Sequence, residues 1–154
     1  MKLKLQSLLA LTAGVLFTQN INAQSLVAIT QDDKVFTMAN IAAPGLISTP
    51  ITVTGMTAGQ TIAGPDVRPL TGELYILGYD ALSNTAQIYS LNTATGVAAA
   101  ISSTPMSLGL GATDAISFDF DPTMDRIRVV GANGKNYNIN PVNGAIVSTD
   151  ADLS

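Results

Sequence analysis

The sequence predicts an all-β fold made of β-propeller-like repeats, each with four short antiparallel strands. Residues 66–78 align without a gap on residues 119–131, about fifty residues later, and the segments 88–96 and 136–144 that follow also match. Short apolar runs alternate with clusters of Gly, Pro, Asn, Asp and Thr, which is typical of strands joined by turns. The sequence after residue 23 shows no sustained helical period. A repeat of this length and composition favours a propeller blade.

Residues 1–23 are predicted to be a secretory signal peptide. Two lysines open the segment, residues 5–17 are mostly apolar, and small residues precede Gln24. The apolar run is too short for a membrane-spanning helix, which needs roughly 20 residues. We therefore expect a secreted or periplasmic protein, with residues 24–154 as a single β-repeat domain and no membrane insertion after cleavage.

The strands of the repeat follow in a regular order. The first strand ends in Asp-x-x-Pro, and a tight turn follows at residues 69–72 or 122–125, where Pro presets φ and Gly or Asp tolerates the last position. An apolar strand ending in Gly comes next, then a Tyr-containing strand and, after a second turn, a last strand. Residues 103–113 are predicted to be a loop. The predicted strands are 26–30, 34–38, 47–54, 61–67, 73–78, 86–91, 97–101, 116–120, 126–131, 135–139 and 145–148.

A weaker copy of the repeat precedes these two. Residues 26–30 take the place of the apolar strand, and residues 35–38 take the place of the Tyr-containing strand. Together the copies make about two and a half blades, whereas a closed propeller needs about four to eight. Three arrangements fit this count: a domain truncated at its C-terminus, an oligomer that completes the ring, or a short open stack. We favour truncation, then oligomerisation.

The tight turns are flanked by opposite charges. Arg68 and Glu73 flank the first turn, and Asp121 and Arg126 take the same places in the second copy with the signs exchanged. Residues that close a hairpin loop sit opposite each other, where opposite charges contribute about 0.2–1 kcal/mol. We interpret both pairs as structural charge pairs, because a catalytic role would not tolerate the exchange.

The repeats resemble the domain of unknown function 4394 family of secreted bacterial proteins. The resemblance is carried by residues 26–30, 66–78 and 88–92 and, most specifically, by residues 118–130. It covers nearly the whole mature chain. The resemblance implies a secreted β-repeat protein and no particular activity. In one copy the family's Asp-Phe-x-Pro is replaced by Asp-Val-Arg-Pro, after an unusual Pro65, and members of the family look longer than this chain.

The composition excludes several classes of function. The chain has no Cys, no His and no Trp. Catalytic triads with His, Cys nucleophiles, zinc sites with His or Cys, and haem ligation by these residues are therefore excluded. After removal of the signal peptide five basic residues remain against 11 acidic ones, a net charge of −6. Such an acidic chain has no electrostatic attraction for nucleic acid or anionic lipid.

Calcium is the one cofactor that the sequence suggests. Asp114 and three further aspartates, Asp119, Asp121 and Asp125, form an acidic group, and oxygen ligands suit this ion. Their spacing matches no calcium loop, however, and aspartates are ordinary turn residues. The last three are retained as weak metal candidates, while turns are the preferred interpretation. No catalytic or cofactor-binding residue is predicted.

Two further groups have a functional and a structural interpretation. Arg126 and Arg128 share one face of a predicted strand and could bind an anion, but pairing with neighbouring aspartates is preferred. Tyr89 and Tyr137 could stack on sugars. Their equivalent positions in the repeat favour packing between blades.

The sequence therefore predicts an exported β-propeller-like binding or structural module without a catalytic signature. Its ligand is not specified by the residues. A polysaccharide, a partner protein or further copies of the chain fit the expected location. The alternative is a calcium- and carboxylate-dependent hydrolase or lyase of the propeller type, which would use acidic residues alone.

Overall fold

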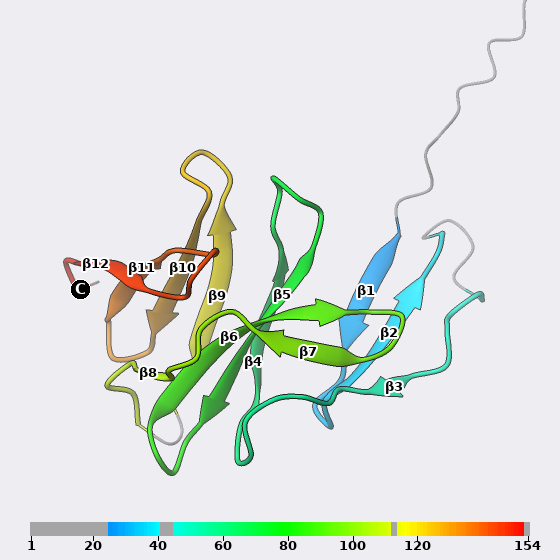
Figure 1. Ribbon diagram of the computed structural model, residues 1–154, viewed down its shortest axis with the longest axis horizontal. Coiled ribbons are helices and arrows are strands. Elements are labelled where there is room, and N and C mark those ends of the chain that lie inside the picture. Colours follow the sequence, from blue (N-terminus) through cyan, green and yellow to red (C-terminus); the bar gives the residue numbers. More distant parts are fainter. Residues whose placement is uncertain (1–24, 41–44, 112–113, 153–154) are drawn as a thin grey trace, which may run out of the picture.

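The computed structural model describes residues 25–40, 45–111 and 114–152, and these form three antiparallel sheets, none of them closed (Figure 1). The described residues form strands, turns and loops without a helix, and so none could cross a membrane as a helix. The predicted all-β class is confirmed. The expected signal peptide, residues 1–23, lies outside the described residues.

Sheet A is the first sheet along the chain and has three strands. They follow the order β1-β2-β3, with β1 at one edge. The predicted strand 47–54 is only partly formed, because β3 is short and Ile47 makes just an isolated bridge to Met38. The strands are β1 (Leu26–Ile29), β2 (Lys34–Met38) and β3 (Ile51–Thr52).

Sheet B is the central sheet. Its strands β4 to β7 follow one another in space as they do in sequence, and β8 pairs with the beginning of β6, which β7 leaves uncovered. Strand β8 lies within residues 103–113, so the prediction of a loop there was wrong at two residues. The strands are β4 (Thr61–Val67), β5 (Leu74–Asp80), β6 (Thr85–Asn92), β7 (Val97–Ala100) and β8 (Met106–Ser107).

Sheet C repeats the simple order of sheet B. Its four strands are consecutive neighbours, and β9 lies side by side with β4 of sheet B. The predicted boundaries agree with the observed ones to within two residues. The strands are β9 (Ile116–Asp121), β10 (Arg126–Gly131), β11 (Asn136–Ile139) and β12 (Ile146–Asp150).

Sheet B separates two hydrophobic cores, because the side chains of a strand point alternately to its two faces. Tyr75 and Leu77 of β5 pack in the core shared with sheet C, whereas Leu74 and Ile76 pack in the core shared with sheet A. Strand β5 is accordingly buried over nearly its whole length. The sheets are thus stacked in the order A, B, C.

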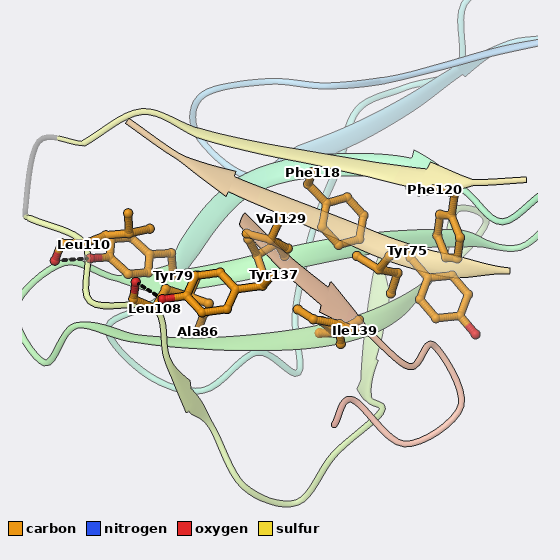
Figure 2. Close-up of a cluster of buried hydrophobic side chains, with 13 residues drawn as sticks. Tyr75, Tyr79, Ala86, Leu108, Leu110, Phe118, Phe120, Val129, Tyr137 and Ile139 are labelled. Carbon is orange, nitrogen blue, oxygen red and sulfur yellow. Dashed lines mark hydrogen bonds between the residues drawn. The ribbon is translucent and has the colours of Figure 1, made fainter. Parts of the chain in front are cut away.

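The core between sheets B and C is rich in aromatic rings (Figure 2). Tyr75 meets Phe120 edge to face, with ring centroids 5.3 Å apart. The Tyr137 hydroxyl donates a hydrogen bond to the carbonyl oxygen of Leu108 over 2.6 Å. Tyr89 is buried in the other core. Both tyrosines that the sequence assigned to packing are therefore core residues, each with a polar partner for its hydroxyl.

Candidate binding groove

A hollow on the described surface lies between strand β1 and strands β4 and β5. Two adjoining hollows of about 600 and 470 Å³ form it. They share lining residues from both sheets, namely Ser25, Val27, Val67, Gly72 and Leu74. We call this region the β1 groove.

The β1 groove follows an edge strand. Strand β1 pairs with β2, and no strand of the described chain pairs with its other side. Strand β5 of sheet B and strand β10 of sheet C occupy the position that β1 occupies in sheet A, with two following strands on one side. On their other side, however, β5 pairs with β4 and β10 pairs with β9. The groove therefore lies where the other two sheets have a first strand. It leaves backbone donors and acceptors of β1 available for pairing.

The floor of the β1 groove is apolar and its rim is polar. Val27 packs against the core between sheets A and B, and Leu74, which is only 7% exposed, belongs to it. Asp66 lines one hollow and Glu73 lines the other, and no Lys or Arg lines either of them. The groove thus combines an unpaired strand edge, an apolar floor and a lining without basic residues.

Arg68 lies next to the groove, but its guanidinium is bound elsewhere. Its Nε and Nη2 donate hydrogen bonds to the two carboxylate oxygens of Asp125 over 2.9 and 2.5 Å. The ion pair joins the β4–β5 turn of sheet B to the β9–β10 turn of sheet C, and the Arg68 side chain is only 11% exposed. This pairing raises the pKa of Arg68 and lowers that of Asp125.

The prediction that oppositely charged side chains pair across each of the two hairpins was wrong. Arg68 and Glu73 do close their hairpin, since the Arg68 N–H donates to the Glu73 carbonyl oxygen, and Arg126 is the register partner of Asp121. Within the described chain, however, neither pair of side chains forms a salt bridge. The carboxylate of Asp125 on the neighbouring sheet binds Arg68 instead, because it accepts two hydrogen bonds in parallel.

The three aspartates retained as metal candidates have separate surroundings. Asp125 binds Arg68. Asp121 accepts hydrogen bonds from the N–H and hydroxyl of Thr123, and these bonds lower the pKa of Asp121. Asp119 faces Asp66. Among the described residues no group of three or more acidic side chains is arranged to hold a metal ion.

Asp66 and Asp119 form a carboxyl pair between the first strands of sheets B and C. The hydrogen bond and the charge of Asp66 raise the pKa of Asp119, and desolvation adds to this effect. Asp66 Oδ2 also accepts a hydrogen bond from the Phe120 N–H over 2.7 Å. The Asp66 carboxylate is therefore directed to sheet C, although the residue also lines one of the hollows of the β1 groove.

Arg128 and Arg126 face away from the groove, on the outer side of sheet C. Arg128 donates hydrogen bonds to Asp150 and to the Asn136 side chain, as the preferred aspartate pairing predicted. Arg126 donates to the Asp125 carbonyl oxygen. The prediction that Gly or Asp takes the last position of each tight turn agrees with the backbone. Gly72 and Asp125 have positive φ angles of +72° and +48°.

The β1 groove was not among the sites predicted from the sequence, although a signal for it was present. The first copy of the repeat has an apolar strand and an aromatic strand, but no Asp-x-x-Pro strand directly before them. Without such a strand among the described residues, β1 is left as an edge strand. The depth of the groove could not be foreseen, because it depends on how closely sheets A and B pack.

Comparison with known protein families gives a match over most of the chain. The family model described as Domain of unknown function (DUF4394) matches residues 35–154. No curated protein and no solved structure matches the chain.

Proposed function

Because the chain belongs to the family of the Domain of unknown function (DUF4394), whose description assigns no activity, we propose a function from its own residues: an exported binding module that receives a polypeptide strand in the β1 groove. The observation that carries the proposal is the free edge of β1 beside an apolar floor. An exposed strand edge pairs with an extended peptide through main-chain hydrogen bonds, and adjacent pockets select side chains.

The neighbouring sheets support a strand as the ligand. In sheet B the place corresponding to the groove is filled by β4, which pairs with β5, and in sheet C it is filled by β9, which pairs with β10. Strands β4 and β9 then pack against each other. A peptide strand in the groove would pair with β1 and pack against β4 in the same way.

The lining of the groove defines the chemistry of the ligand. Val27, Val67 and Leu74 offer apolar contacts to one side of a bound strand. Glu73 favours positive charge, no basic residue lines the groove, and the net charge of the chain is also negative. We therefore expect a segment of a partner protein in which apolar residues alternate with Lys or Arg.

The stacked sheets also support the propeller-like interpretation of the repeats. Sheets B and C share the same strand order, and Tyr89 and Tyr137 are both buried against the preceding sheet. In this proposal sheet A is a blade without its first strand, and the described chain holds somewhat less than three blades. Export rests on the signal peptide that the sequence predicts at residues 1–23.

A synthetic peptide tests the proposed function. The probe is a seven-residue peptide of alternating Val and Lys with blocked ends, which matches the length of β4. We expect saturable binding in calorimetry and NMR shifts along β1, with much weaker binding of the Val–Glu counterpart. Val67→Arg should weaken binding about tenfold or more, because it places positive charge in the groove.

The matched control is Val147→Arg on sheet C. Val67 and Val147 are strand-region valines that are 43% and 55% exposed, so neither substitution should unfold the protein. Equal binding by the two variants would contradict the assignment to the groove. Absence of shifts along β1 at saturating peptide would reject strand addition as the function.

A further inference from the structure

The free edge of β1 presents the main-chain groups of two alternate residues. The Thr30 N–H donates a hydrogen bond to the Lys34 carbonyl oxygen over 2.9 Å, so it points to β2. Because main-chain groups alternate in direction along a strand, those of Ala28 also point to β2, whereas those of Val27 and Ile29 point away from it. Two N–H and two C=O groups are therefore directed to the β1 groove, which Val27 and Ile29 both line.

Strand β5 has the same arrangement on the side that β4 occupies. The Arg68 N–H donates a hydrogen bond to the Glu73 carbonyl oxygen at the end of this ladder. The alternation makes the register partners Asp66 and Tyr75 the next hydrogen-bonded pair. Tyr75 packs in the core with the following sheet C, just as Val27 packs in the core with the following sheet B. The edge of β1 therefore offers the pattern that β5 uses to bind β4.

The β1 groove ends at the turn between β1 and β2. The Asp33 Oδ1 atom accepts a hydrogen bond from the Ile62 N–H over 3.0 Å, which joins this turn to β4. No residue of the turn, residues 30–33, lines either hollow, and Ile29 is the last residue of β1 that does. Pairing with a ligand is therefore confined to β1, with Val27 and Ile29 as its hydrogen-bonded positions.

We propose that the β1 groove holds its peptide antiparallel to β1, with two ligand residues that each exchange a pair of main-chain hydrogen bonds with Val27 or Ile29. This inference rests on the proposed function and adds the direction and the register of the ligand. The strands that occupy this place in the other two sheets, β4 and β9, are both antiparallel to their neighbours β5 and β10. Antiparallel pairs are also slightly more stable per residue than parallel ones.

The direction of the ligand decides which of its nitrogens reach β1. Val27 and Ile29 turn their side chains to the core with sheet B, so the ligand residues directly opposite them face the floor of the groove. In an antiparallel ligand these floor-facing residues also direct their own N–H and C=O groups to β1. In a parallel ligand the residues between them would do so. The proposed ligand therefore needs free main-chain N–H groups on its apolar residues and not on its Lys or Arg residues.

Main-chain methylation of the synthetic peptide tests the direction. One version of the seven-residue Val–Lys probe carries a methyl group on the main-chain nitrogen of every Val, and the other on that of every Lys. We expect the first version to bind about tenfold or more weakly than the unmethylated probe, because it loses hydrogen bonds to β1, and the second to bind within about twofold of it. The reverse order would show a parallel ligand. It would overturn this proposal while the proposed function stands.

Spin labels on the same probe give an independent measurement. A nitroxide at its N-terminal end should broaden the NMR signals of the Ile29 and Thr30 amides most, and one at its C-terminal end those of Ser25 and Leu26. The opposite assignment would again show a parallel ligand. Equal binding of both methylated versions would mean that β1 makes no main-chain pairing, which overturns this proposal. A probe that does not bind at all would reject the proposed function and this inference with it.

Discussion

Sheets A and C stand at the two ends of one stack, but their outer faces differ in polarity. Sheet C has all four strands, and its outer face is occupied by Arg128 and its hydrogen-bond partners. Sheet A has three strands, a free edge at β1 and apolar residues on its outer face. Repeat proteins require terminal units with polar outer faces for solubility. Sheet C meets this requirement, whereas sheet A, with its free edge and the apolar residues on its outer face, does not.

The interface between sheets B and C is also more extensive than the interface between sheets A and B. The core between sheets B and C contains 13 buried residues, and the core between sheets A and B contains seven. Sheet C is also tied to sheet B by the Arg68–Asp125 ion pair. We infer that sheets B and C form the more stable unit and that sheet A opens at lower free energy.

Truncating a side chain on one face of β5 or on the other should distinguish the contributions of the two interfaces to stability. Ile76 faces sheet A and Leu77 faces sheet C, and both are fully buried. Each change to Ala should cost about 2–5 kcal/mol, since it leaves a cavity in a packed core. We expect Leu77→Ala to lower the free energy of global unfolding more, as measured in urea. Ile76→Ala should mainly speed amide exchange in β1 and β2.

The outcome of this comparison can contradict the inferred order of stability. Equal protection of β1 and β10 in the unmodified protein, with the same loss in both variants, would show that the three sheets unfold as one unit. Leu82→Ala is a suitable control, because this side chain is 98% exposed and should leave both measurements unchanged.

The turn-to-turn ion pair should make a smaller contribution to holding sheets B and C together. We expect a double-mutant cycle of Arg68→Ala and Asp125→Ala to show coupling in the free energy of unfolding, because the pair is bidentate and Arg68 is largely buried. The cycle of Arg68→Ala with Glu73→Ala should be additive. Coupling to Glu73 instead would restore the charge pair that the sequence predicted within the hairpin.

The sign of the pH dependence follows from the lowered pKa of Asp125. Its carboxylate is stabilised in the folded state, so the contribution is present above the ordinary value of 3.8 and is lost as the pH falls through the lower folded pKa. The coupling between Arg68 and Asp125 should therefore disappear in acid. Coupling that persists after Asp125 is protonated would assign the effect to packing of the Arg68 side chain.

The sequence predicted what depends on neighbours along the chain. Alternation and turn residues located β4, β10 and the left-handed turn positions at Gly72 and Asp125. It could not predict which carboxylate binds Arg68, because Asp125 lies 57 residues away and reaches Arg68 only after sheets B and C have packed. The β1 groove could not be predicted for the same reason, because residues far apart in the sequence form it only after sheets A and B have packed.

The smallest expected effect concerns the carboxyl pair between β4 and β9, the kind of contact that sheet A lacks at β1. Asp66 raises the pKa of Asp119, so the folded state favours the protonated form of Asp119. This group therefore lowers stability as the pH rises from 3.8 through its folded pKa. Asp66→Asn should move the pKa of Asp119 down toward its ordinary value in an NMR titration. An asparagine Oδ1 can still accept the Phe120 N–H, so β9 should keep its position. An unchanged Asp119 titration would mean that desolvation, and not the neighbouring carboxyl, raises the pKa of Asp119.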